Sequence, residues 1–144
     1  MAAGAASWTD LLDPSPEELR AALPAGVHES ALEQLQAPAQ HDDEPRPKLD
    51  SHGDYIFGVL LIPVVIPEED VVYYQEVDFV LTRKRIVTVR KTPGARDPYP
   101  AARVADVCDM HKHELPPGQI AFHLVDDVAE RYLDLLDDVD EEID

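Results

Sequence analysis

Tyr55-Ile-Phe-Gly-Val-Leu-Leu-Ile62 is a continuous apolar run of strand length, and it decides the fold. A run of this kind is typical of a β-strand that is buried on both faces. Residues 71–82 are rich in β-branched and aromatic side chains, and Glu76 and Asp78 alternate with apolar neighbours. Residues 85–90 alternate again. The polar turn between the last two runs predicts a hairpin, although the usual turn glycine is absent.

Helix signals flank these strands. After a short opening strand at 8–12, Ser15, Pro16 and Glu18 form a helix start with a capping box, and this helix should end near residue 23. A second helix is expected at about 29–36. The following proline-rich segment is predicted to be a loop up to Asp50, and a weaker helical pattern spans 99–110.

Residues 119–144 predict a long helix. Its apolar side chains recur at helical spacing: Val125, Val128, Tyr132, Leu135 and Val139. Ten Asp or Glu residues against one Arg make this helix strongly acidic. No glycine or proline ends it, so we expect the chain to be a fragment of a longer protein.

The composition limits the classes of function. The chain has 144 residues, a length that suits one domain of residues 1–144. Its formal net charge of −18 disfavours binding to nucleic acids or anionic membranes. We expect residues 1–7 to be flexible, 8–118 to form an α/β core and 119–144 to begin the acidic helix. Cys108 is the only cysteine, which excludes an internal disulfide. No apolar stretch reaches the length of a membrane helix.

Few residues suggest catalysis. Phosphate-binding glycine loops and the nucleophile elbow of hydrolases are missing, so we expect no enzymatic activity. Cys108, His111, His113 and His123 are candidate zinc ligands, but their spacing matches no standard zinc finger. A buried thiol near surface histidines is the simpler interpretation. Five basic residues within 83–91 could contact anions, or could belong to a charged hairpin that blunts a sheet edge.

The acidic residues are stronger candidates. Asp126, Asp127, Glu130 and Asp134 lie at helical spacing that gathers carboxylates near one face. Mg²⁺ prefers such oxygen ligands. A solvated helix face that keeps the domain soluble is the competing interpretation.

The order of several short motifs resembles the cytosolic N-terminal domain of the CorA family of magnesium and cobalt channels. The resemblance runs from Trp8 onward and rests on these stretches: Trp8–Leu12, Pro14–Leu19, Gly26–His28, Leu32–Glu33, Arg46–Asp50, Asp54–Phe57, Val77–Thr82, Ile86–Val89, Leu124–Asp126, Arg131–Tyr132 and Asp140–Asp144. It implies an α/β/α sandwich with a mixed sheet, attached in full-length members to a stalk helix and two transmembrane helices that are absent here. It further implies a homopentamer at the cytoplasmic face of the membrane, whose pore is closed by metal bound between neighbouring cytosolic domains.

The resemblance also implies candidate metal residues. Glu33 and Asp126 match acidic positions near the family's intersubunit sites for Mg²⁺ or Co²⁺. Gln34 stands where many members have Asp, and an amide is a poorer Mg²⁺ ligand than a carboxylate. We expect weak regulatory Mg²⁺ binding, because both halves of an intersubunit site are not present together in one fragment. We also expect the fragment to be monomeric or weakly associating, because the stalk and membrane parts supply much of the family's assembly. The alternative is a free-standing soluble, acidic protein-interaction module with no transport role, whose partner helix would dock on the Val125–Val139 stripe.

Overall fold

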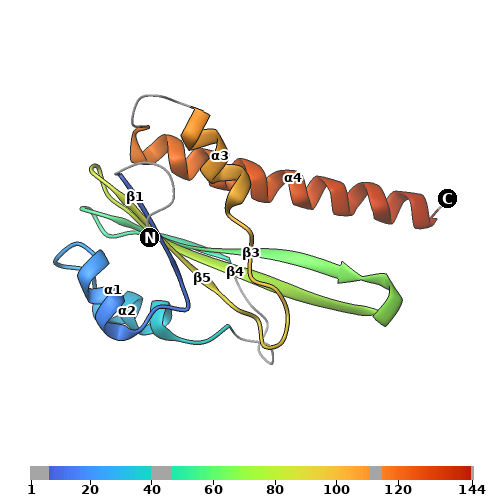
Figure 1. Ribbon diagram of the computed structural model, residues 1–144, viewed down its shortest axis with the longest axis horizontal. Coiled ribbons are helices and arrows are strands. Elements are labelled where there is room, and N and C mark those ends of the chain that lie inside the picture. Colours follow the sequence, from blue (N-terminus) through green and yellow to red (C-terminus); the bar gives the residue numbers. More distant parts are fainter. Residues whose placement is uncertain (1–6, 40–46, 111–114, 144) are drawn as a thin grey trace.

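The computed structural model describes residues 7–39, 47–110 and 115–143. Within these ranges the chain forms helices and strands that stack in three layers (Figure 1). The elements, in chain order, are β1 (Trp8–Leu12), α1 (Pro16–Ala22), α2 (Glu29–Gln36), β2 (Lys48–Ser51), β3 (Ile56–Ile66), the short 3-10 helix η1 (Pro67–Glu69), β4 (Val71–Leu81), β5 (Ile86–Lys91), α3 (Ala102–Met110) and α4 (Pro117–Ile143).

One mixed sheet forms the middle layer. Its strand order is β1-β5-β4-β3-β2, with β1 parallel to β5 and the other pairs antiparallel. Helices α1 and α2 cover one face, and α3 and α4 cover the other (Figure 1). This arrangement confirms the predicted α/β/α sandwich with a mixed sheet.

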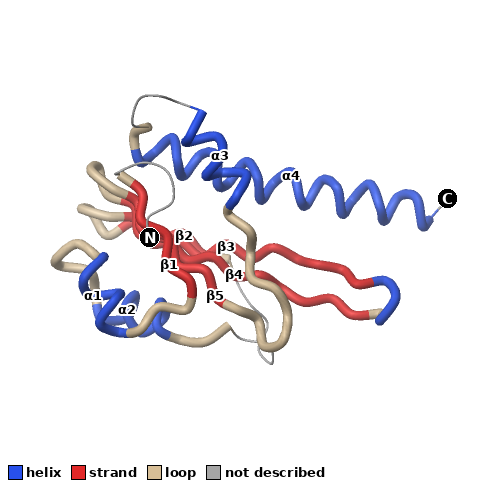
Figure 2. Tube along the Cα trace, viewed as in Figure 1, coloured by secondary structure: helices blue, strands red, loops and turns tan. Residues whose placement is uncertain are grey.

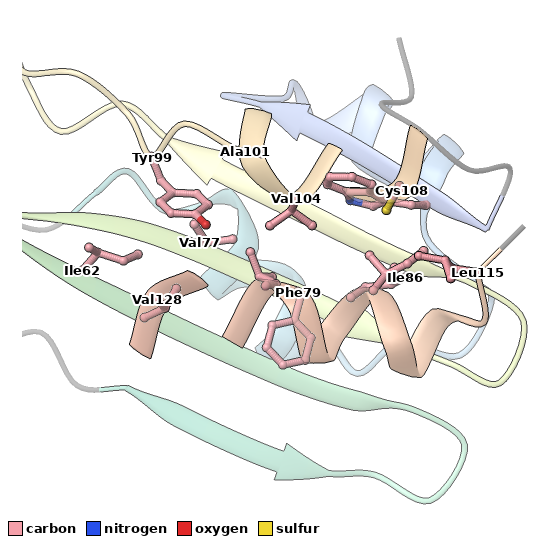
Figure 3. Close-up of a cluster of buried hydrophobic side chains, with 13 residues drawn as sticks. Ile62, Val77, Phe79, Ile86, Tyr99, Ala101, Val104, Cys108, Leu115 and Val128 are labelled. Atoms are coloured by element: carbon pink, nitrogen blue, oxygen red, sulfur yellow. The ribbon is translucent and has the colours of Figure 1, made fainter. Parts of the chain in front are cut away.

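The alternation of side chains along the strands divides the core in two. Odd-numbered residues of β3, such as Phe57 and Leu61, pack with Leu19 of α1 and Leu35 of α2. The larger cluster lies on the opposite face, between the sheet and helices α3 and α4 (Figure 3); its buried members are Trp8, Ile62, Val77, Phe79, Ile86, Tyr99, Ala101, Val104, Cys108, Leu115, Ile120, Leu124 and Val128.

The helix starts follow from local sequence. The Ser15 side chain accepts a hydrogen bond from the Glu18 N–H, and the Glu18 carboxylate accepts one from the Ser15 N–H. Pro16 occupies the first turn, where no hydrogen-bonding N–H is needed. The predicted capping box of α1 is therefore confirmed.

Beyond β2 and β5, strands β3 and β4 continue together as a two-stranded ribbon that extends from the sheet (Figure 2). Pro63 lies in this ribbon, where β4 is the only neighbour of β3. An edge strand tolerates a proline, because the missing N–H faces away from the paired strand. The predicted end of this strand at Ile62 was therefore too early by four residues.

Two other boundaries differ from the sequence prediction. The segment expected to be a loop as far as Asp50 contains β2, which pairs with residues 56–59 of β3. Helix α3 begins at Ala102 rather than at Tyr99, which instead lies fully buried ahead of the helix. Pairing and burial with distant residues decide both outcomes, and neither is visible in the local pattern.

The hairpin between β4 and β5 forms without a turn glycine because hydrogen bonds of Thr82 hold the turn. The Thr82 N–H donates to the Arg85 carbonyl at 2.9 Å, and the Thr82 hydroxyl accepts from the N–H groups of Lys84 and Arg85 at 3.3 and 3.1 Å. Side-chain bonds of this kind stabilise a turn in ordinary negative-φ backbone.

The inner face of α4 differs from the predicted stripe. Ile120, Leu124 and Val128 face the sheet and are buried, whereas Val125 and Tyr132 are 47% and 39% exposed. Leu135 is half-buried, and the side chain of Val139 lies outside the described part. The predicted stripe therefore combines the buried Val128 with exposed side chains, because α4 carries two apolar stripes at helical spacing and only packing against the sheet selects the buried one.

Candidate functional site

Glu33 and Gln34 lie in the last turn of α2. Glu33 is exposed, and no ion pair of this carboxylate occurs among the described residues. Gln34 is half-buried, and its backbone carbonyl accepts a hydrogen bond from Lys91 Nζ at 2.7 Å. Lys91 of β5 thus anchors the backbone next to the candidate ligand Glu33.

Asp126 is exposed on α4 and lines a shallow hollow of about 160 Å³ between α3 and α4. The hollow is also lined by Asp127 and Glu130, together with Arg103 of α3. Asp134, the fourth member of the predicted acidic cluster, is exposed one turn further along α4. The structure therefore brings three of the four predicted carboxylates to one hollow.

Two of these three carboxylates already have cationic partners. Asp127 is buried, forms ion pairs with Arg103 and Arg131 at 3.1 Å each, and accepts a short hydrogen bond from the Tyr99 hydroxyl. Glu130 pairs with Arg103 at 2.7 Å. Burial and the hydrogen bond to Asp127 raise the pKa of Tyr99, so this phenol stays protonated as a donor. Asp127 therefore links α4 to the rest of the domain, and Asp126 is the one of the three that forms no ion pair among the described residues.

Glu33 and Asp126 are not brought together within one chain. Helix α2 covers one face of the sheet and α4 covers the other, so the sheet separates the two carboxylates (Figure 1). No group of three or more His, Cys, Asp or Glu side chains in the described ranges is arranged to hold a metal ion. A site that uses both residues requires a second copy of the chain.

A buried charged cluster beneath α2 was missed at the sequence level. Asp78 is fully buried, and Lys91 Nζ lies 3.0 Å from its Oδ2 atom and 2.8 Å from Glu76 Oε2. Burial and the neighbouring Glu76 raise the pKa of Asp78 to about 8 despite Lys91. The alternation along β4 places Glu76 and Asp78 on one face, but it does not reveal that helices cover both faces of the sheet.

The hairpin expected at residues 83–91 forms, but its expected role of blunting a sheet edge was wrong. Strands β4 and β5 lie inside the sheet, so their turn blunts no edge. Lys91 is buried, and Arg90 forms an ion pair with Asp10 of β1 at 2.7 Å, so both stabilise the sheet. The remaining three basic residues are exposed at the turn: Arg83, Lys84 and Arg85.

The zinc hypothesis gains no support. Cys108 is buried in α3, and burial raises the pKa of its thiol, which disfavours the thiolate that zinc requires. His111 and His113 lie outside the described residues, and His123 lies on α4.

None of the described helices has the length and apolar composition needed to cross a membrane. The sequence shows no significant match to any curated protein.

Two solved structures share the fold. One is a full-length CmaX protein, with a TM-score of 0.68 and 16% identity; the comparison covers 94% of this chain and 39% of that one. The other is the complete CorA magnesium transporter from Methanocaldococcus jannaschii, with a TM-score of 0.61 and 18% identity, covering 94% of this chain and 40% of that one. The chain thus spans about two fifths of the length of these structures. The family model described as CorA-like Mg²⁺ transporter protein matches residues 3–144. The chain therefore belongs to the CorA-like Mg²⁺ transporter family.

Proposed function

We propose that this chain is the cation-sensing cytosolic domain of a CorA-type protein that transports Mg²⁺, and also Co²⁺, across a membrane. Family membership over residues 3–144 supports the transport role. The observation that carries the sensing role is the placement of Glu33 and Asp126, two exposed carboxylates on opposite outer layers of the sandwich.

Carboxylates on opposite layers suit a cation shared between copies. In a ring of identical subunits, one outer layer of each domain faces the other outer layer of its neighbour. Glu33 of one copy and Asp126 of the next then approach the same interface, and a divalent cation between them offsets their repulsion. Cation occupancy would bias the packing of the ring, which is the energetic requirement for sensing.

The exposed side of α4 offers a surface for the remainder of such a protein. Phe122, Val125, Leu133 and Leu136 are 47–62% exposed and fall on one side of the helix, which we call the outer stripe. The acidic residues Asp126, Glu130, Asp134 and Asp137 follow one flank of this stripe at helical spacing. An exposed apolar stripe of this length is typical of an interface, and we propose that further helices of the same protein, or a neighbouring subunit, cover it.

Gln34 should make the response to Mg²⁺ weak. Its amide is neutral, and its backbone carbonyl is occupied by Lys91. Glu33 is therefore the one carboxylate that this turn of α2 offers, and Mg²⁺ retains several of its waters at such a sparse site.

An uptake experiment tests the transport proposal. The coding sequence past Asp144 should supply two apolar segments of about 20 residues each. That longer protein, made in cells that lack their own Mg²⁺ uptake, should restore growth at low Mg²⁺. Absence of Mg²⁺ and Co²⁺ uptake by a well-expressed protein would rule out the transport role.

A pair of variants tests the sensing role separately. Glu33→Gln should reduce the inhibition of uptake by internal Mg²⁺, because it removes one ligand of the shared cation. Glu29→Gln, on the exposed first turn of the same helix, removes the same charge and should behave as wild type. Equal inhibition in both variants would leave transport standing and reject Glu33 as a sensor.

A further inference from the structure

Among the described residues of this acidic chain, positive charge without an ion-pair partner is concentrated at one turn. The structure describes ten Lys and Arg residues, and six of them form ion pairs: Lys48, Arg90, Lys91, Arg96, Arg103 and Arg131. Of the other four, three are consecutive at the β4–β5 turn, namely Arg83, Lys84 and Arg85, which we call the basic turn. Because this turn lies between central strands, edge protection does not explain it.

The basic turn borders a large hollow of the described surface. This hollow of about 730 Å³ is lined by the basic turn, Thr82, Pro24 and the β2–β3 turn at Gly53 and Asp54. A second hollow of about 340 Å³ shares Arg83 and Asp54 with it and reaches residues 116–118 at the start of α4. Both volumes are of the size that holds small organic ligands, and the first exceeds the needs of a single inorganic ion.

The local chemistry favours a phosphate-bearing anion. Arg85 Nη1 donates to the Ala22 carbonyl at 3.0 Å, so this guanidinium is held beside the hollow with its other N–H groups available. Arginine matches phosphate oxygens with two parallel hydrogen bonds, and Lys84 adds a point charge. The N-terminal end of α4 adds positive potential at the second hollow. Among the described residues, Asp54 is the one carboxylate that lines either hollow, and it opposes an anion.

We infer that the hollow between the basic turn and the β2–β3 turn binds a phosphate-bearing anion, either a free molecule such as a nucleotide or a lipid headgroup. The net charge of the rest of the chain repels anions, so affinity depends mainly on the basic turn and falls with ionic strength. Arg83 lines both hollows, so its loss should affect binding most. This site shares no residue with the proposed cation site at Glu33 and Asp126.

Titration with sodium pyrophosphate by calorimetry, at low ionic strength and without divalent cations, tests the inference. Binding to the 144-residue chain should weaken about tenfold in Arg83→Gln, the usual effect of losing a hydrogen bond between charged groups. Asp54→Asn should strengthen binding about threefold, since it removes one repelling charge near the anion. The matched controls Arg20→Gln and Asp106→Asn, both at exposed positions outside the hollows, should change binding less than twofold.

Vesicles distinguish the two sources of phosphate. Binding to phosphatidylglycerol but not phosphatidylcholine vesicles, in competition with pyrophosphate, would assign the site to a lipid headgroup, whereas pyrophosphate binding without vesicle binding would assign it to a free ligand. The inference is overturned if pyrophosphate does not bind at millimolar concentration, or if Arg20→Gln weakens binding as much as Arg83→Gln. It is also overturned if Arg83→Gln changes only the mass of the protein in solution, because the basic turn would then contact the acidic surface of a second copy.

Discussion

Asp78 is the residue whose environment departs furthest from that of a carboxylate in water. It is fully buried, and its one cationic neighbour among the described residues, Lys91, is shared with Glu76 and with the Gln34 carbonyl. A single ammonium cannot offset the burial of two carboxylates, so Asp78 keeps its proton up to a pH of about 8, its pKa in the folded chain. The proton, rather than a second cation, completes the charge balance beneath α2.

This balance predicts a pH-dependent effect of Asp78→Asn. The pKa of Asp78 is raised from 3.8 to about 8 on folding, so its contribution to stability is fully present below pH 3.8 and is lost as the pH rises through 8. The free energy of unfolding of the variant should therefore rise relative to wild type across this window, by about 1 kcal/mol or more. Urea titrations at pH 4.5, 6 and 8 measure the difference. Asp106→Asn, at an exposed position of α3, controls for net charge. A difference in free energy of unfolding between Asp78→Asn and wild type that does not change with pH would contradict the prediction.

Gly58 is required by a neighbour rather than by its own backbone. It pairs with Phe79 across β3 and β4, and a Cβ atom at Gly58 would lie 2.3 Å from two carbons of the Phe79 ring. Phe79 is only 4% exposed, so its ring has no free space to enter. Gly58→Ala should therefore lower the free energy of unfolding by about 1–3 kcal/mol.

Thermal and urea unfolding check this prediction with two further variants. Gly118→Ala, where nothing lies within 4 Å of the added Cβ, should leave the free energy of unfolding unchanged or raise it by up to about 1 kcal/mol. Phe79→Leu should recover part of the loss when combined with Gly58→Ala, since it removes the ring carbons that the methyl group meets. Equal stability of Gly58→Ala and wild type would show that the ring moves aside without cost.

At the scale of the element, the two sides of α4 differ in burial. Leu124 lies on the inner side and is 2% exposed, whereas Leu133 lies on the outer stripe and is 60% exposed. Substitution by alanine should therefore lower the free energy of unfolding by about 2–5 kcal/mol at Leu124. At Leu133 it should change the free energy of unfolding by no more than about 0.5 kcal/mol. Urea unfolding of Leu124→Ala and Leu133→Ala measures both. A large loss at Leu133 would mean that the outer stripe is already covered in the chain alone.

Elements could be predicted from the sequence where their cause is local. Ser15 and Glu18 define the start of α1 through their own hydrogen bonds, and the apolar run at 55–62 needs no partner to be identified as a strand. Strand β2 could not be predicted, because Leu49 is 70% exposed and pairing with β3 is what makes the segment extended. Helical periodicity likewise could not say which of the two apolar stripes of α4 is buried.

The candidate site shows the same division between local and long-range information. Glu33 and Asp126 could each be placed on a helix from the sequence. Their separation by the sheet depends on topology, as does the use of Asp127 and Glu130 as partners of Arg103. The burial of Asp78 was missed because alternation indicates which residues share a face, but not whether a helix covers that face.

At the scale of the whole molecule, net charge governs association. Each copy carries −18, so two copies repel one another at low ionic strength, and each supplies only one side of the proposed cation site. We therefore predict that the chain without divalent cations is a monomer of 16.0 kDa in light scattering. Millimolar Mg²⁺ should increase the average mass more than NaCl of equal ionic strength, because a divalent cation both screens and bridges the carboxylates.

Variants separate bridging from screening in that measurement. Glu33→Gln and Asp126→Asn should each abolish the excess over NaCl, since either substitution removes one side of the shared cation. Glu29→Gln and Asp106→Asn remove the same charge from exposed positions and should retain the excess mass over NaCl. Two results would contradict the prediction: a stable pentamer without Mg²⁺, which would mean that association needs no cation, or submicromolar Mg²⁺ affinity of the monomer in calorimetry, which would mean that one chain holds a complete site.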